Sequence, residues 1–319
     1  MTADDAPSKS IDSDEPETAA ADERIYHLDG ELVPASEATV SVDDRGFRYG
    51  DGAFETLRAY GGQLYEWGAH ADRLEATCDA IDLAHGLSRT ELRQRIEATL
   101  AANDLVDAYV RLSITRGVQP GKLTPQPVTD PTVVVMVKPL PRGGLEGKPV
   151  WDGPATLQTV KRRRIPDDAL PADAKTHNYL NGILARTELH DADEALVRDL
   201  EGYVAEGATS NVFFVDEEGL HTPTTETDVL PGITRRVVLD LARKAGIPTH
   251  EGWYRPIDVR QADEVFLTNT TWEVRPVATV DAIDLEGEYG DDDTTDGPPV
   301  TTLLAKLYDE RVERRCYSD

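Results

Sequence analysis

The sequence predicts an α/β (α+β) protein built from two domains. Strand-like and helix-like patterns occur on both sides of a cluster of prolines and glycines at 138–144, which predicts an interdomain connector over 139–148. The chain has 319 residues, enough for two domains that each bury a core of their own. We therefore expect a small N-terminal domain over 23–138 and a larger C-terminal domain over 149–319.

The first residues are rich in Asp, Glu, Ser, Ala and Pro and carry hardly any large apolar side chain, so they predict a disordered acidic tail over 1–22. The ordered chain is expected to begin near Ile25, with a hairpin turn at Asp29-Gly30. Apolar and alternating runs predict the rest of the N-terminal domain: strands at 39–42, 53–60, 63–65, 108–115 and 132–138, and helices at 68–84 and 89–102.

The C-terminal domain is predicted to alternate strands and helices. Its predicted strands cover residues 155–160, 193–198, 203–205, 211–215, 263–268 and 274–280. Its predicted helices cover residues 176–190, 233–245 and 299–315. An insertion rich in Asp, Glu, Thr and Gly at 286–297 predicts an acidic surface loop.

The chain is strongly acidic, with 60 Asp and Glu against 33 Lys and Arg, a formal net charge of −27 and a pI near 4.5. Such an excess opposes binding to nucleic acid and to anionic membranes, because phosphate groups require clustered cations. The acids are spread along the chain and lysine is scarce, which favours a protein adapted to high cytoplasmic salt. An acidic protein of an ordinary mesophile is the alternative.

Two cysteines, Cys78 and Cys316, cannot form a disulfide framework and fit a reducing cytosol. No apolar run approaches the length of a membrane span, and no signal peptide opens the chain. We therefore expect a cytoplasmic protein that acts on a small molecule, with no nucleic-acid partner, no membrane contact and no metal site.

The most informative stretch, residues 172–211, sets Lys175 before a helix-like pattern and Glu206 in a loop of small residues. A lysine that is to form a Schiff base needs a fixed, partly desolvated position. An acid held against a pyridine nitrogen keeps that nitrogen protonated. An ordinary surface lysine and a solvated loop acid are the alternatives. The functional interpretation is favoured because the chain has only eight lysines, and because Glu206-Gly-Ala-Thr-Ser-Asn precedes the apolar strand 212–215.

This stretch resembles the fold-type IV, or class IV, pyridoxal-phosphate enzymes, which include branched-chain and D-amino acid aminotransferases and 4-amino-4-deoxychorismate lyase. The family's motifs occur in the family's order from Asp44 to near Arg315. The resemblance implies the two-domain fold of the D-amino acid aminotransferase type, with pyridoxal 5′-phosphate at the domain interface, and a homodimer. It also implies that Lys175 anchors the cofactor and moves protons, and that Glu206 contacts the pyridine nitrogen.

Further motifs are expected to bind the cofactor phosphate. His70-Ala-Asp-Arg-Leu matches the family's H-x-x-R-L, whose arginine is here Arg73, a residue type suited to bidentate phosphate binding. Leu230-Pro-Gly-Ile-Thr opens a helix whose first amides, near Ile233 and Thr234, would face a phosphate. A surface arginine and a plain helix start are the alternatives.

Two more cofactor contacts follow from the resemblance. The family's phosphate-binding threonine corresponds to Thr270. A tyrosine that bonds the ring oxygen of the cofactor corresponds to Tyr179, which stands one helical turn after Lys175 if this segment is helical. A half-buried packing tyrosine is the alternative.

Lyases and aminotransferases of this family differ in the substrate site. Thr56 stands where branched-chain aminotransferases usually have glycine and where the lyases have a threonine thought to donate a proton to the leaving group. An arginine before glycine, here Arg116, together with Arg111, is expected to bind a substrate carboxylate. Tyr49 and Thr271, within the same motifs, complete the predicted substrate-binding residues.

These features favour a 4-amino-4-deoxychorismate lyase that releases pyruvate and p-aminobenzoate, with Lys175 as the base and Thr56 as the candidate proton donor. The alternative is an aminotransferase for branched-chain or D-amino acids, because Glu206-Gly-Ala-Thr-Ser-Asn and the segment 268–274 resemble the aminotransferases more. A protein that carries the cofactor without turnover is the outside alternative, and the presence of Lys175 opposes it.

Overall fold

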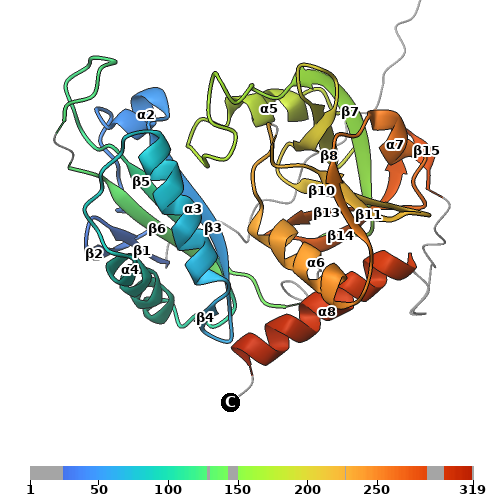
Figure 1. Ribbon diagram of the computed structural model, residues 1–319. Helices are drawn as coiled ribbons and strands as arrows, with labels where there is room; N and C mark the ends of the chain where they lie inside the picture. Colours follow the sequence, from blue (N-terminus) through green and yellow to red (C-terminus); the bar gives the residue numbers. More distant parts are fainter. Residues whose placement is uncertain (1–23, 128–129, 143–149, 227, 286–297, 318–319) are drawn as a thin grey trace, which may run out of the picture.

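The structure is a computed structural model that shows two β-sheets, each packed against helices (Figure 1). It describes residues 24–127, 130–142, 150–226, 228–285 and 298–317. The predicted acidic tail and the predicted acidic insertion lie outside the described residues. Within the described part of the chain, no helix is both long and apolar enough to cross a membrane.

The N-terminal sheet is antiparallel throughout, in the order β2-β1-β6-β5-β3-β4. Its strands are β1 (Ile25–Leu28), β2 (Glu31–Pro34), β3 (Gly52–Tyr60), β4 (Gln63–Leu64), β5 (Ala108–Thr115) and β6 (Val133–Pro139). Leu28 pairs with Glu31 across the predicted Asp29-Gly30 turn, so the hairpin is confirmed. Helices α3 (Trp67–Ala80) and α4 (Arg89–Ala102) pack on this sheet and bury Leu74 and Ile96 in its core.

Strand β3 serves two different environments because successive side chains of a strand point to opposite faces. Ala53 and Leu57 lie in the N-terminal core. Phe54 and Thr56, on the other face, line a cavity shared with the C-terminal part of the chain, and Tyr60 belongs to the C-terminal core. The alternation of this one strand therefore builds both a core and an interface.

The C-terminal sheet is mixed, in the order β12-β11-β10-β13-β14-β7-β8-β9, with β15 paired to β14. Its strands are β7 (Ala155–Arg163), β8 (Glu194–Arg198), β9 (Val204–Gly207), β10 (Asn211–Asp216), β11 (Gly219–Pro223), β12 (Thr249–Gly252), β13 (Glu264–Asn269), β14 (Glu273–Val280) and β15 (Ile283–Asp284). Its helices are α5 (Leu180–Arg186), α6 (Ile233–Lys244), α7 (Pro256–Arg260) and α8 (Pro299–Cys316). Helices α6 and α8 share one hydrophobic core with β10 and β13.

Ion pairs connect the two sheets. Arg58 of β3 is buried and donates to Glu273 of β14 at 3.0 Å. Glu66, which precedes α3, accepts from Arg236 of α6 at 3.0 Å and from Arg311 of α8 at 2.7 Å. These ion pairs therefore join β3 to β14 and the start of α3 to helices α6 and α8.

Most predicted elements are present within one to three residues, but two predictions are wrong. Residues 39–42, which the structure describes, form no strand; Val40 and Val42 are exposed, so their alternation does not mark a buried face. The predicted helix 176–190 is reduced to α5, because the preceding residues extend along β3. The sequence did not reveal the short elements α2 (Arg45–Tyr49), α7, β11, β12 and β15.

Candidate active site

A cavity of about 460 Å³ lies between the two sheets. Strands β3 and β5 and helix α3 contribute one part of its wall, and the β9–β10 turn, the start of α6 and the β13–β14 turn contribute another. Most site residues predicted from the sequence line it: Thr56, Arg73, Arg111, Lys175, Tyr179, Glu206, Leu230, Ile233, Thr234, Thr270 and Thr271.

Lys175 reaches the cavity from an extended segment rather than from a helix. Its carbonyl accepts from the Phe54 amide at 3.0 Å, and its own amide donates to Thr77 Oγ1 at 3.0 Å. Lys175 Nζ lies 3.1 Å from the Tyr179 hydroxyl and 4.5 Å from the centre of the Phe54 ring. The predicted proximity of Lys175 and Tyr179 is confirmed, although the predicted helical turn between them is wrong.

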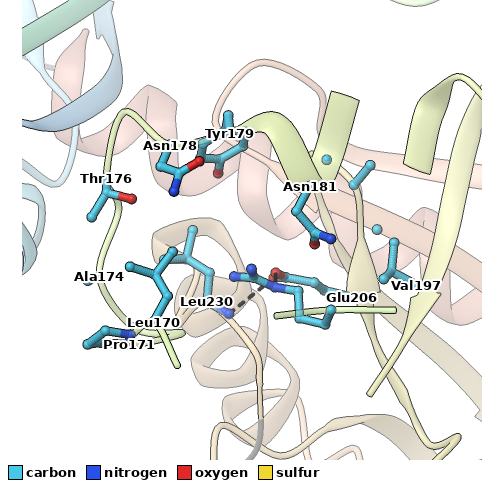
Figure 2. Close-up of a pocket in the computed structure, with 14 residues that line it drawn as sticks. Leu170, Pro171, Ala174, Thr176, Asn178, Tyr179, Asn181, Val197, Glu206 and Leu230 are labelled. Atoms are coloured by element: carbon cyan, nitrogen blue, oxygen red, sulfur yellow. Dashed lines mark hydrogen bonds and ion pairs between the residues drawn. The ribbon is translucent and has the colours of Figure 1, made fainter. Parts of the chain in front are cut away.

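Glu206 lines both the main cavity and a smaller cavity of about 40 Å³, whose lining residues Figure 2 shows. Arg164 Nε donates to Oε1 at 2.8 Å, and the Leu230 amide donates to Oε2 at 3.1 Å. Burial raises the pKa of Glu206, whereas the Arg164 charge and the Leu230 amide lower it. The carboxyl group is therefore buried, fixed in orientation and paired with one cation.

Arg73 extends from α3 toward the C-terminal sheet. Its Nε and Nη2 donate to the Glu55 carboxylate at 2.8 and 2.7 Å, and its Nη1 donates to the Pro231 carbonyl at 3.0 Å. His70 Nδ1 lies 2.7 Å from Glu55. Burial opposes the charge of Glu55, but Arg73 and His70 outweigh it and hold the pKa of Glu55 at about 2. This charged pair fixes the Arg73 guanidinium at the cavity wall.

Helix α6 begins at the cavity wall with Ile233, after a Pro-Gly turn. The first amides of a helix lack intrahelical acceptors and favour an anion. A Cβ at Gly232 would lie 1.9 Å from Asn211 Oδ1, so glycine is needed for this approach. Within the described part of the chain, the buried Thr268 Oγ1 has no hydrogen-bond partner. Together with Arg73, these groups can bind a phosphate.

Thr56 and Arg111 face the cavity from neighbouring strands, directly opposite each other in the β3–β5 register. The Arg111 guanidinium lies 3.9 Å from the centre of the Phe54 ring. Thr56 is the half-buried residue of β3, where the other residues are buried. A hydroxyl and a guanidinium therefore line the same cavity as Lys175, whose amine also lies over the Phe54 ring.

Two predicted substrate-binding residues do not line this cavity. Arg116 is buried and donates to Asp51 at 2.9 Å and to the Asp82 and Ile81 carbonyls at 2.6 Å. Its guanidinium is therefore directed to these groups and not into the cavity. Tyr49 ends α2 on the surface, with 38% of its area exposed.

Other cavity or supporting residues were missed by the sequence interpretation: Phe54, Arg164, His177, Asn211 and Thr268. For Phe54 a signal existed, because it stands two residues before Thr56 and strand alternation puts both on one face. Arg164 lies 42 positions before Glu206 in the sequence, and their contact depends on the tertiary fold.

The chain belongs to the family described as amino-transferase class IV, whose model matches residues 52–280. A protein of Methanocaldococcus jannaschii named "putative branched-chain-amino-acid aminotransferase" is 39% identical over 260 residues, covering 81% of this chain and 88% of that protein. The D-alanine aminotransferase of Listeria monocytogenes is 34% identical over 91% of this chain and 96% of its own length. The aminodeoxychorismate lyase of Bacillus subtilis is 29% identical over 91% and 95%.

Solved structures agree with this assignment. The branched-chain aminotransferase of the archaeon Thermoproteus uzoniensis, solved with norvaline, superposes with a TM-score of 0.81 and 29% identity, covering 92% of this chain and 96% of that one. Another branched-chain amino acid aminotransferase, solved in complex with N-(5′-phosphopyridoxyl)-L-glutamate, also superposes with a TM-score of 0.81. The predicted fold class, the two-domain fold-type IV architecture, is therefore confirmed.

The cofactor of this class is pyridoxal 5′-phosphate, and the residues present fit it. The Thr268 hydroxyl, which has no hydrogen-bond partner among the described residues, the first α6 amides and Arg73 suit a phosphate. The Lys175 amine and the buried Glu206 carboxyl group would suit the aldehyde and the pyridine nitrogen of this cofactor. The protein is a pyridoxal-phosphate-dependent class IV enzyme.

Proposed function

We propose that this enzyme is an aminotransferase that moves an amino group between an amino acid and a 2-oxo acid. Names of aminotransferases predominate among the relatives, including those with 39% and 34% identity, while the lyase shares 29%. This support reverses the preference for a lyase that Thr56 and Arg116 suggested. The observation that carries the proposal is the higher identity of these aminotransferases over nearly the same share of the chain, and the placement of Lys175, Glu206 and Arg111 around one cavity supplies the groups that the reaction needs.

The position of each residue at the cavity supports the role proposed for it. Lys175 would hold the cofactor and move a proton at the substrate carbon, and the Tyr179 hydroxyl, 3.1 Å from the Lys175 amine, would orient that amine. Arg73 and the start of α6 bind the phosphate. Arg111 binds a substrate carboxylate. When bound, the cofactor supplies an electron sink, and Glu206 sustains it by keeping the ring nitrogen protonated.

The reaction itself is tested by substrate pairs. The purified enzyme, in molar KCl, is incubated with single amino acids of either configuration and 2-oxoglutarate, and separately with 4-amino-4-deoxychorismate. We expect formation of glutamate and a new 2-oxo acid. Production of p-aminobenzoate without any amino-group transfer would contradict the proposal.

A lyase remains the second candidate because the Thr56 hydroxyl lines the cavity opposite Arg111. If Thr56 protonates a leaving group, Thr56→Gly should lower p-aminobenzoate formation by roughly 10²–10⁴-fold, the usual size of general acid catalysis. If the enzyme is an aminotransferase, Thr56→Gly should keep the rate of amino transfer and change only the preference among amino acids. Both activities, measured on wild type and variant, separate the two candidates.

Arg73→Ala should weaken cofactor binding about tenfold to a hundredfold, corresponding to the ~1.5–3 kcal/mol of a charge-assisted hydrogen bond. The variant should also melt at a lower temperature, because Glu55 stays buried without its main cation. Titration of the apo-protein with pyridoxal phosphate measures the first effect. Arg89→Ala, at an exposed arginine paired with Glu75, is the control; equal affinities for all three proteins would exclude Arg73 from the phosphate site.

We also propose a homodimer. Exposed apolar residues occur on three segments that contact one another, namely Val42, Phe47, Val118, Leu123, Leu180 and Ile183. A Cβ placed on Gly50 would lie 3.5 Å from Asn178, so the end of α2 lies next to the start of α5. A second copy would cover this surface. A mass of a single chain, measured by light scattering, would contradict the homodimer.

The cytoplasmic location and the adaptation to high salt remain predictions from the sequence.

A further inference from the structure

Thr77 of α3 is a buried residue to which the roles above assign no function. It is 1% exposed, and its hydroxyl oxygen accepts a hydrogen bond from the backbone amide of Lys175 at 3.0 Å. The two residues stand 98 positions apart in the sequence, so the contact joins helix α3 to the segment that carries the Lys175 amine. A backbone amide that is shielded from water needs an acceptor, and the Thr77 hydroxyl supplies one.

The backbone around Lys175 is held from two sides. On the side of β3, its carbonyl accepts from the Phe54 amide at 3.0 Å, and the His177 amide donates to the Gly52 carbonyl at 2.8 Å. On the side of α3, its amide donates to Thr77. The bonds to β3 involve the carbonyl of Lys175 and the residues after it, whereas the bond to Thr77 fixes its amide. Together they fix the point from which the Lys175 side chain extends into the cavity.

Helix α3 also carries Arg73, four residues before Thr77. Four residues span about 6 Å along a helix axis, and residues at this spacing share one face. Arg73 is itself fixed by the Glu55 carboxylate at 2.7 and 2.8 Å. One face of one helix therefore presents both a cation suited to a phosphate and the acceptor for the Lys175 amide. Pyridoxal phosphate has its aldehyde and its phosphate on one small ring, so the groups that bind them must keep a constant separation.

We propose that Thr77 is a positioning residue, which holds the Lys175 amine at a constant distance from the phosphate site that includes Arg73. Thr77 is not among the residues that line the cavity, so it acts through the backbone of Lys175 and not by touching cofactor or substrate. A reacting group misplaced by about 1 Å can react roughly a hundredfold more slowly. The inference rests on the proposed function, because it takes Lys175 as the residue that holds the cofactor.

The test compares the full-length wild type, Thr77→Val and Thr77→Ser after the bound cofactor has been removed. Pyridoxal phosphate is then added in excess, and the growth of the visible absorbance gives the rate at which Lys175 forms its covalent link. Pyridoxamine phosphate carries an amine in place of the aldehyde and forms no such link. Its dissociation constant, measured by calorimetry, therefore reports non-covalent binding alone.

We expect Thr77→Val to form the link about tenfold to a hundredfold more slowly, because the Lys175 amide loses its acceptor and the amine loses its fixed position. The affinity for pyridoxamine phosphate should stay within about threefold of the wild type, because Arg73 and the start of α6 are unchanged. Serine keeps the hydroxyl, so Thr77→Ser should restore most of the rate. If the valine variant does not fold, Thr77→Ala is measured in its place, with the same expected results.

Thr99→Val is the matched control. Thr99 is 0% exposed on α4, the other helix that packs on this sheet, and its hydroxyl donates to the Arg95 carbonyl at 2.7 Å. Loss of this buried hydroxyl should lower the melting temperature by a few degrees and leave the rate of link formation unchanged. A purely structural role of Thr77 would give the same result as this control.

Three results would overturn the inference. The first is a valine variant that forms the link within about twofold of the wild-type rate. The second is an affinity for pyridoxamine phosphate that falls as much as the rate, which would mean that the whole helix has moved. The third is a serine variant that is no faster than valine. A wild type that forms the link and depends on Thr77 but transfers no amino group would refute the proposed function and leave this inference standing.

Discussion

Lys175→Ala is expected to abolish the visible absorbance of the bound cofactor and to lower turnover by about 10⁴-fold or more, because the covalent anchor and the proton carrier are lost together. The structure predicts little effect on folding, since the backbone contacts of this residue with Phe54 and Thr77 do not involve its side chain. Absorbance spectra and steady-state rates of the purified variant measure both effects.

Lys161→Ala is the matched control, because Lys161 is an exposed lysine on β7 and carries the same charge. It should retain the spectrum and the rate of the wild type. A colourless wild type that stays colourless after pyridoxal phosphate is added would contradict the assignment of Lys175, and so would an alanine variant that turns over normally.

The sequence predicted the neighbourhood of Lys175 correctly but for a wrong reason. A spacing of four residues suggested that Lys175 and Tyr179 share one face of a helix. In the structure the chain is extended here, because the carbonyl of Lys175 and the amide of His177 bond to β3, and α5 begins only at Leu180. A contact between segments that are distant in the sequence overrides the local helical pattern, and periodicity cannot reveal such a contact.

Arginines illustrate the same limit. Arg73, Arg111 and Arg116 were all assigned to anions on the basis of their motifs, yet only the first two line the cavity. In β5 the even-numbered residues face the core, so strand alternation places Arg111 on the opposite face, toward the cavity. Arg116 lies beyond the end of β5 and turns to Asp51. Residue type and motif predict the charge of a site, but the direction of each side chain depends on tertiary structure.

The support of the site was largely beyond prediction. Glu55 was expected only as part of a strand, but it is the buried carboxylate that fixes Arg73. Arg164 was not singled out among 25 arginines, although it pairs with Glu206. These partners come from different elements, so one sequence contains no signal that joins them. The sequence could predict residues such as Lys175, Arg73 and Glu206, because the chemistry of each is tied to a local motif.

Glu206→Gln is expected to leave cofactor binding largely intact and to lower turnover by about 10²–10³-fold or more, the size of losing one charge-stabilising group. The amide has nearly the shape of the carboxylate but no charge, so it cannot keep the ring nitrogen protonated and the electron sink is weakened. The amide group must also place an N–H against either Arg164 or the Leu230 amide, both of which are donors.

The lower turnover of Glu206→Gln must be distinguished from the effect of removing any negative charge and from a loss of protein stability. Glu201→Gln removes the same charge from an exposed turn between β8 and β9 and should behave as wild type. If Glu206 acts on the ring nitrogen, the Glu206→Gln variant should show a lower turnover rate and a changed absorbance spectrum of the bound cofactor. The dissociation constant of the cofactor should change only a few-fold. A variant that loses the cofactor altogether would instead make Glu206 a binding residue. A variant as fast as the wild type would remove it from the chemistry, because its burial beside Arg164 would then serve the fold alone.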